Sequence, residues 1–268
     1  YVNKLCGEIS DAAGEMKGMN VRSIFIGGGT PSILPPKLMG KIMDAVINRY
    51  DVDSKAEITM EANPGTVSPE QLKLCHEAGI NRISFGLQST VQQELDMLGR
   101  IHTYEEFLQS YHWAREAGIS NINVDLMFAI PGQTCESWKH NLETVAELSP
   151  EHISAYSLII EEGTPFAQKK LILPTEDEEY QMYEDTAEIL RKYGFHQYEI
   201  SNYARDGFEC RTRVTGSAQN IWEPVWEQHR CFGESGSVIP EICRHIWQTA
   251  QNRRRSGRML RRFPETTK

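Results

Sequence analysis

The sequence predicts an α/β fold in which a parallel sheet is wrapped by helices and curved into a (β/α) half-barrel or barrel. Short apolar segments alternate with helical patterns at intervals of about 25 to 35 residues, which is typical of parallel strands joined by crossover helices. Nearly every apolar segment also ends in a glycine or a polar residue, and barrels of this class carry their chemistry on the rim formed by those strand ends. We therefore prefer a barrel to an open doubly wound sheet.

The expected strands are rich in Ile, Val or Phe and are closed by Gly, Pro or Asn, a pattern typical of strands covered on both faces. Residues 2–16 read as a crossover helix that leads into the first of these strands, so we expect one further strand upstream of Tyr1. The expected strands span residues 21–29, 57–65, 82–88, 121–132 and 152–160.

Helix start and stop signals separate the strands. Ser68 is expected to be an N-cap with Gly79 at the end of its helix. Thr103 repeats this pattern with Glu106 three residues on, as in a capping box. The expected helices span residues 35–50, 68–79, 90–99, 103–118, 134–149 and 175–194.

Composition limits the class of protein. The formal net charge is −9, with 40% hydrophobic and 24% charged residues, which is typical of a globular chain rather than a disordered or fibrous one. No segment approaches the roughly 18 to 20 consecutive apolar residues of a transmembrane helix, and the start shows no signal-peptide pattern. The six cysteines have no tight spacing, so we expect reduced thiols and a cytoplasmic protein. Tyr1 in place of Met indicates processing, a fragment or an incomplete gene model.

The charge is divided unevenly along the chain. Residues 211–268 hold 11 basic and five acidic side chains, a net charge of +6, whereas residues 1–210 carry −15. An acidic body does not attract nucleic acid, and the short basic run at residues 253–255 is a weak signal for it, so no nucleic-acid partner is expected. Two different compositions therefore meet near Cys210.

The run Gly27-Gly28-Gly29-Thr30-Pro31 follows the first strand directly. Glycines at such a position let backbone N–H groups approach a ligand, because no Cβ stands in the way. The run is neither a dinucleotide-binding fingerprint nor a Walker loop. It could also be a tight turn, but three consecutive glycines favour a binding loop.

Other polar residues lie in or after the later strands. Glu61 lies near the end of an apolar strand and faces a cavity, a partner or solvent, because an unpaired buried carboxylate is unfavourable. Asp125 has apolar residues on both sides and is the stronger candidate. Gln88 and Arg100 flank a short helix, and Arg100 could simply be a cation favoured at a helix C-terminus. The spacing of four histidines indicates no metal site, and we interpret them as surface or packing residues: His102, His112, His140 and His152.

Six segments, in this order, resemble the radical S-adenosylmethionine (SAM) enzymes of the oxygen-independent coproporphyrinogen III oxidase family. Three of them, EANPG, LGRIH and PGQT, make the chain most similar to the haem chaperone branch. The resemblance covers about residues 1–210. The segments are SIFIGGGTPS (23–32), MEANPG (60–65), RISFGLQS (82–89), LGRIHT (98–103), NVDLMFAIPGQT (123–134) and SAYSLIIEEGTPF (154–166).

The resemblance implies a partial (β/α)₆ radical SAM barrel that lacks its first strand, with SAM and a [4Fe–4S] cluster at the rim. It implies that Gly28, Gly29 and Thr30 line the methionine end of SAM. It implies haem or porphyrin as a further ligand and a haem-acceptor protein as a partner. The residues implied to hold the polar atoms of SAM are Glu61, Gln88, Arg100 and Asp125.

Two departures from the family pattern change these expectations. The cluster motif C-x-x-x-C-x-x-C is absent from the chain, so we expect no metal ligands here, a cluster in the intact parent only, and no activity from this chain as written. The His-Asn-x-x-Tyr-Trp motif expected after Ala204 is replaced by an unrelated sequence. We therefore expect an incomplete barrel over residues 1–210 and an irregular basic tail over 211–268 that arises from a frameshift or a foreign join.

Several alternatives stay open. The intact protein could be a non-enzymatic haem carrier, or the true oxidase that decarboxylates coproporphyrinogen III. It could also be a plain (β/α) barrel enzyme without an iron–sulfur centre. The tail could be a basic binding segment, which would be favoured if neither other reading frame restored the missing motif.

Overall fold

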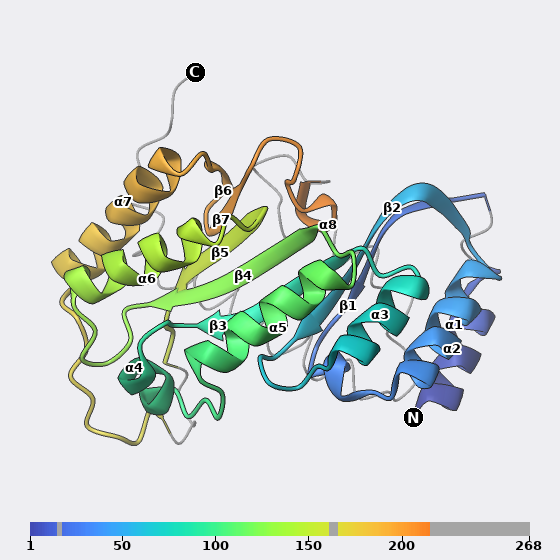
Figure 1. Ribbon diagram of the computed structural model, residues 1–268, viewed down its shortest axis with the longest axis horizontal. Coiled ribbons are helices and arrows are strands. Elements are labelled where there is room, and N and C mark those ends of the chain that lie inside the picture. Colours follow the sequence, from blue (N-terminus) through green and yellow to red (C-terminus); the bar gives the residue numbers. More distant parts are fainter. Residues whose placement is uncertain (15–17, 161–165, 215–268) are drawn as a thin grey trace. The chain divides into compact units, whose positions relative to one another are not determined.

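Strands and helices alternate along the chain, beginning with helix α1 (Val2–Ala12) and strand β1 (Asn20–Ile26) (Figure 1). The structure, a computed structural model, describes residues 1–14, 18–160 and 166–214, all of which belong to one unit. The further described elements are η1 (Pro31–Ile33), α2 (Pro36–Ile47), β2 (Asp51–Ala62), α3 (Pro69–Glu77), β3 (Arg82–Gln88), α4 (Gln92–Met97), α5 (Tyr104–Glu116), β4 (Asn121–Phe128), α6 (Cys135–Glu147), β5 (His152–Ser157), α7 (Glu176–Lys192), β6 (His196–Glu199), β7 (Asn202–Ala204) and α8 (Arg211–Val214).

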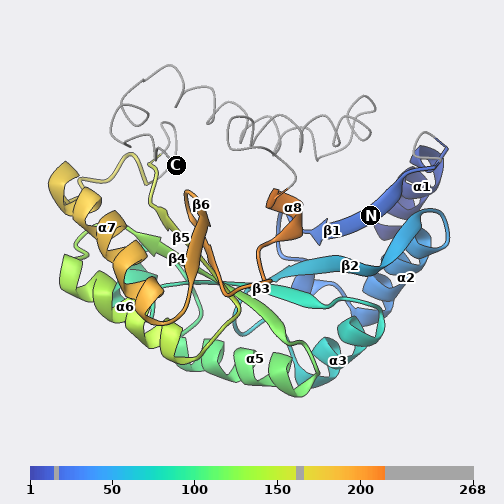
Figure 2. The same cartoon turned by 90° about the horizontal axis from the view of Figure 1, so that it is seen from above.

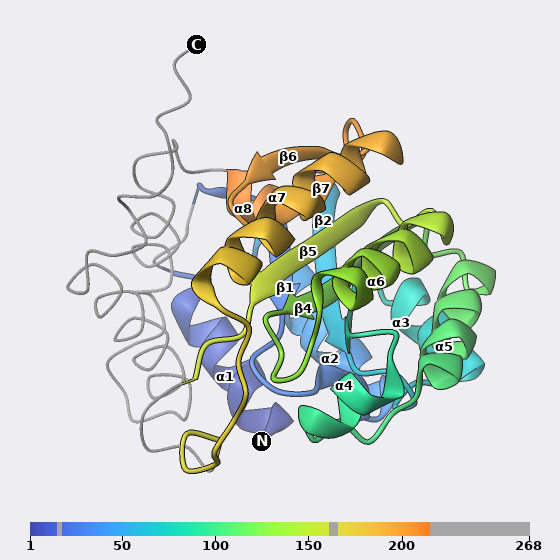
Figure 3. The ribbon, with the colours of Figure 1, turned by 90° about the vertical axis from the view of Figure 1, so that its left-hand side faces the viewer.

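The strands form one sheet in the order β1-β2-β3-β4-β5-β7-β6. Neighbours from β1 to β5 are parallel, whereas β7 pairs antiparallel with both β5 and β6. The parallel strands curl into a half-barrel with α2, α3, α5, α6 and α7 on its outer face and α8 on the inner side (Figure 2). The predicted partial barrel is confirmed, and the antiparallel pair beside β5 is an addition that the sequence pattern did not predict (Figure 3).

The predicted strand positions are confirmed with shifted bounds. Strand β2 begins at Asp51, earlier than the predicted residue 57. Strand β1 ends at Ile26, so the glycines that follow it belong to a loop, and Gly28 there has a φ of +84°. The N-caps predicted at Ser68 and Thr103 are present, and Thr103 forms the full capping box with Glu106.

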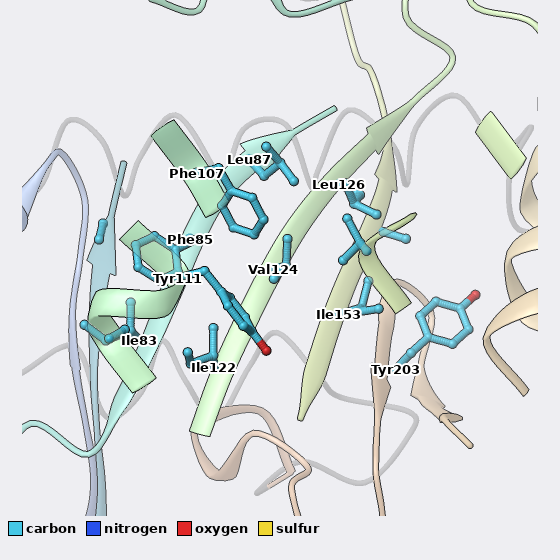
Figure 4. Packing of buried hydrophobic residues seen from close by; sticks show 14 of the residues in the cluster. Ile83, Phe85, Leu87, Phe107, Tyr111, Ile122, Val124, Leu126, Ile153 and Tyr203 are labelled. Carbon is cyan, nitrogen blue, oxygen red and sulfur yellow. The ribbon is translucent and has the colours of Figure 1, made fainter. Parts of the chain in front are cut away.

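The outer face of the sheet carries the main hydrophobic core. Alternate residues of β3 and β4 point toward the helices, where Phe85 meets Phe107 of α5 edge-on at 5.9 Å between ring centroids (Figure 4). Trp138 of α6 is fully buried and its indole N–H donates to the carbonyl of Met182 at 2.9 Å, which ties α6 to α7. Burial of apolar surface is the dominant favourable contribution to folding, and aromatic side chains supply large areas of it.

The inner face of the sheet is polar. The residues that alternate with the core side chains are buried but polar: Thr59, Arg82, Ser84, Asn123, His152 and Ser154. Because buried polar groups require hydrogen-bonding partners, these side chains bond to one another across strands rather than to the helices. The inner face is therefore where the sheet can present chemistry.

The C-terminal part of the described chain attaches to β2. The carboxylate of Glu57 accepts hydrogen bonds from the Cys210 thiol at 3.4 Å and the Arg211 backbone N–H at 3.1 Å. Apart from α8, the predicted irregular tail lies outside the described residues. No helix among the described residues is long and apolar enough to cross a membrane.

Candidate functional site

The glycine loop after β1 is in direct contact with Glu61 of β2. The Gly28 N–H donates a hydrogen bond to Glu61 Oε2 at 3.0 Å. A Cβ on Gly27 would lie 2.7 Å from the same carboxylate oxygen and 2.6 Å from the Phe25 ring, closer than real Cβ atoms approach. Gly27 is thus required by this close approach, and Gly28 by its positive φ.

Thr30 of the same loop is linked to Asn63, which follows β2. The Asn63 amide donates to Thr30 Oγ1 at 3.3 Å. A Cβ on Gly86 would lie 3.2 Å from both Asn63 Oδ1 and Gln88 Nε2. The lack of a side chain at Gly86 therefore leaves room for both amides beside β3.

Gln88 ends β3 in an unusual backbone conformation. Its φ is +73°, in the left-handed region that disfavours residues other than glycine. The side chain is buried, and the Tyr156 hydroxyl of β5 donates to its Oε1 at 2.8 Å. Strained backbone of this kind clusters at functional sites, because the surrounding structure must hold it in place.

Asp125 of β4 has both carboxylate oxygens held by the sheet. Asn123 Nδ2 donates to Oδ1 at 2.8 Å, and Ser84 Oγ donates to Oδ2 at 3.1 Å. Ser84 is also the residue of β3 that pairs with Glu61 of β2. The two carboxylates therefore lie two strands apart, with Ser84 of β3 between their strands.

Arg100 lies in the segment between α4 and α5. His102, two residues on, contacts the carbonyl of Leu87 at 3.1 Å, next to Gln88. Burial lowers the pKa of His102, and the positive charge of Arg100 lowers it further. Within the described part of the chain, no hydrogen bond or ion pair engages the half-buried Arg100 guanidinium.

The structure thus brings most of the predicted site residues together. Gly28, Glu61 and Asp125 are connected through one hydrogen bond and one strand register. Thr30 accepts a hydrogen bond from Asn63, and the Asn63 and Gln88 side chains both lie beside Gly86. Gly29 lies within the loop, where a Cβ on it would meet no atom within 4 Å, and Arg100 stands apart.

A buried carboxylate that the sequence analysis missed supports this rim from the outside. Glu94 of α4 accepts hydrogen bonds from Ser89 at 2.6 Å, from Gln133 at 2.9 Å and from Asn141 at 3.1 Å, and a further one from Ser137. It therefore joins the loop after β3 to the loop after β4. The only sequence signal was an acidic residue on the apolar side of a short helix.

Metal ligands do not gather in the described ranges. Within residues 1–14, 18–160 and 166–214, no three His, Cys, Asp or Glu side chains lie together in a way that could hold a metal ion. The cysteines of these ranges are thiols in separate elements of the chain: Cys6, Cys75, Cys135 and Cys210.

Comparison with known proteins adds sequence relatives and solved structures. The profile of the Radical SAM superfamily matches residues 3–145. The chain is 39% identical to the heme chaperone HemW of Bacillus subtilis, covering 87% of this chain and 60% of the relative. It is also 39% identical to HemW of Escherichia coli, covering 83% of this chain and 57% of the relative. The chain therefore spans less than two thirds of the length of these relatives.

A solved structure agrees with these relatives. Coproporphyrinogen III oxidase (HemN) from Escherichia coli, a radical SAM enzyme, superposes with a TM-score of 0.71 and 26% identity, over 82% of this chain and 50% of that chain. The polar inner face, the glycine loop against Glu61 and these matches lead to one conclusion. The chain belongs to the radical SAM superfamily, in the family that contains HemN and the heme chaperone HemW.

Proposed function

We propose that the chain binds SAM on the rim of the half-barrel and that its parent protein handles haem or porphyrin, as a haem chaperone does. The observation that carries the proposal is the hydrogen bond between the Gly28 N–H and Glu61, beside the held carboxylate of Asp125. Family membership supports the choice of SAM over other nucleosides.

The side chains at the rim suit the polar groups of SAM. Its ammonium and ribose hydroxyls can donate hydrogen bonds to Glu61 and Asp125. Its carboxylate can accept hydrogen bonds from the N–H groups of a glycine loop. Gly28, Gly29 and Thr30 would lie against the methionine end, and the Arg100 guanidinium would supply a positive charge. Gln88, fixed by Tyr156, would offer an amide. When bound, SAM supplies the radical chemistry after which the superfamily is named.

The described residues do not fit an iron–sulfur cluster. Three thiolates hold such a cluster, and in the part of the chain that the structure describes the cysteines lie in separate elements without a common site. As part of the proposal, the cluster of the intact parent is held by cysteines outside these residues. This chain alone would then bind SAM without performing radical chemistry.

The haem-handling role is favoured over porphyrinogen decarboxylation by the comparisons. The chain is 39% identical to proteins named as heme chaperones and 26% identical to the coproporphyrinogen III oxidase of known structure. In this proposal the parent protein binds haem, passes it to an acceptor protein, and resides in the cytoplasm. A protein that decarboxylates coproporphyrinogen III is the second candidate.

The SAM part of the proposal is tested by calorimetric titration of the full chain with S-adenosylhomocysteine (SAH), which carries the same ribose and amino-acid groups. We expect saturable binding that Glu61→Ala and Asp125→Ala each weaken about tenfold or more, the effect of losing a hydrogen bond to a charged group. Glu77→Ala, an exposed carboxylate on α3, is the control and should bind normally. Absence of binding, or equal binding by all variants, would refute it.

The haem part is tested separately. The protein is titrated with haem while the absorption spectrum is recorded, and transfer of the bound haem to an apo-haem protein is then measured. Binding and transfer without consumption of coproporphyrinogen III would support a haem chaperone. Consumption of coproporphyrinogen III by the cluster-loaded parent would support the oxidase.

A further inference from the structure

The imidazole of His152 is buried on the polar inner face of the sheet. His152 begins β5 and is only 1% exposed. Its Nδ1 lies 2.5 Å from Asn123 Oδ1 on β4, and its Nε2 lies 2.7 Å from the Tyr198 hydroxyl on β6. The Tyr198 hydroxyl also accepts from the Cys210 backbone N–H at 3.2 Å. These contacts join β6 to β4 through β5.

The direction of each hydrogen bond follows from the Asp125 carboxylate. An ionised carboxylate only accepts, so the Asn123 side chain must turn its NH₂ group toward Asp125, at 2.8 Å. The same NH₂ group donates to Ser84 Oγ at 2.7 Å, and this leaves the Ser84 hydroxyl hydrogen to donate to the other Asp125 oxygen.

The orientation of Asn123 then determines the state of His152. Asn123 Oδ1 faces the imidazole and is an acceptor, so His152 Nδ1 must carry a hydrogen. In the neutral ring Nε2 is then an acceptor, and the Tyr198 hydroxyl can donate to it while accepting from Cys210. The hydrogen bonds thus form a series that runs from Tyr198 through His152, Asn123 and Ser84 to Asp125, and each donor in it has an acceptor.

We propose that His152, held as its Nδ1–H tautomer by Tyr198, is a positioning residue that orients the Asp125 carboxylate through Asn123 for the ribose hydroxyls of the bound nucleoside. This inference deepens the proposed function and rests on it. His152 is linked to Asp125 through Asn123, so it acts by fixing which way the Asn123 amide points.

A packing role alone does not explain these contacts. A buried imidazole needs partners, but a packing histidine could donate from either nitrogen. Here each Asp125 oxygen accepts one hydrogen bond, from Asn123 or from Ser84, so the carboxylate is held in one rotation while each oxygen keeps a further lone pair for a ligand. Carboxylates whose rotation is restricted in this way discriminate between ligands with and without hydroxyl groups.

The tautomer is tested first, by ¹⁵N NMR of the histidine side chains in the full chain, with the His152 signals identified by their loss in His152→Asn. The proposal expects the Nδ1–H tautomer in the wild-type chain and its loss or mixing in Tyr198→Phe. A pure Nε2–H tautomer in the wild-type chain would overturn it. This measurement needs no ligand.

The effect on the site is tested by titration with SAH and with its analogue that lacks both ribose hydroxyls. The ratio of the two affinities should fall about tenfold in His152→Leu, as it should in Asp125→Ala, because an oriented charge-assisted hydrogen bond is lost. His152→Asn keeps a donor near the position of Nδ1 and should recover much of the ratio. Tyr203→Phe, at a buried tyrosine of β7 outside this series, should keep the wild-type ratio.

The possible results separate this inference from the function on which it rests. If the wild-type chain favours SAH over the analogue and both His152→Leu and Tyr198→Phe keep that ratio, the positioning role is wrong and the SAM site stands. If the wild-type chain binds SAH and the analogue equally well, the ribose role of Asp125 and the positioning role of His152 both fail; if it binds neither, the proposed function fails as well. Tyr198→Phe removes one oxygen atom and keeps the ring, so the test holds even if His152→Leu does not fold.

Discussion

The backbone N–H of Gly28 and the carboxylate of Glu61 are joined by a 3.0 Å hydrogen bond, across the loop after β1 and the end of β2. This contact exists because Gly27 has no side chain: a Cβ there would lie 2.7 Å from the same carboxylate oxygen. The loop and the carboxylate therefore depend on each other, and a substitution in either should displace the other.

The first prediction concerns Gly27→Ala. The new methyl group would displace the Glu61 carboxylate, so we expect SAH affinity to fall about tenfold or more while the core of the sheet is unaffected. Gly40→Ala is the matched control, because nothing lies within 4 Å of a Cβ on this residue of α2. A helical alanine there should stabilise the fold by about 0.5 to 1 kcal/mol and leave binding unchanged. Normal SAH binding by Gly27→Ala would contradict the prediction.

The second prediction concerns Glu94→Gln. Glu94 is 7% exposed, and its carboxylate accepts four hydrogen bonds from side-chain hydroxyl and amide groups. An amide in its place would set one NH₂ group against these donors, so the free energy of unfolding should fall by about 1 to 3 kcal/mol in urea denaturation. Glu116→Gln, an exposed residue at the end of α5, should change it by less than about 0.5 kcal/mol. Equal stability of the two variants would show that the buried network is not stabilising.

Much of this architecture could be predicted from the sequence, because its signals are local. A run such as RISFGLQ reports a buried strand by its own composition, and Thr103 with Glu106 reports a helix start within four residues. The polar residues that end parallel strands converge by the topology of the sheet alone. For this reason Glu61, Gln88 and Asp125 could be chosen before their contacts were known.

The parts that could not be predicted depend on contacts distant in sequence. Strands β6 and β7 have four and three residues, too few to show a period; β7 is a strand because it pairs with β5, and β6 because it pairs with β7. His152 looks like an ordinary polar residue at the start of a strand. Its importance appears only when Asn123 and Tyr198, 29 and 46 residues away, are brought to its two nitrogens.

The third prediction concerns pH and His102. Burial, followed by the charge of Arg100, lowers the pKa of this imidazole, so the folded state holds it neutral where the unfolded chain would bind a proton near pH 6.5. A group whose pKa is lower in the folded than in the unfolded state contributes stability above its unfolded pKa. This contribution is lost as the pH falls below that value towards the folded pKa. The wild-type chain should therefore lose more unfolding free energy between pH 7.5 and about pH 5 than His102→Gln, in paired urea titrations. His112→Gln, at an exposed position of α5, should keep the wild-type slope, and identical slopes for all three proteins would exclude this role.

The last prediction separates binding from stability at Gln88. Its left-handed backbone, with φ of +73°, costs a residue other than glycine about 1 to 2 kcal/mol, so Gln88→Gly relieves strain. The same change removes the hydrogen bond from Tyr156, which contributes about 0.5 to 1.5 kcal/mol. These effects offset each other, so the unfolding free energy should change by less than about 1 kcal/mol.

SAH binding by Gln88→Gly should instead weaken about tenfold or more, because the amide at the end of β3 is gone. Ala129→Gly is the matched control, since Ala129 is also left-handed, with φ of +57°, at the end of β4. It undergoes the same backbone change without losing a polar group and should bind SAH as the wild-type chain does. If Gln88→Gly bound SAH normally, the strained backbone would serve the fold alone, and the amide would have to be removed from the proposed site.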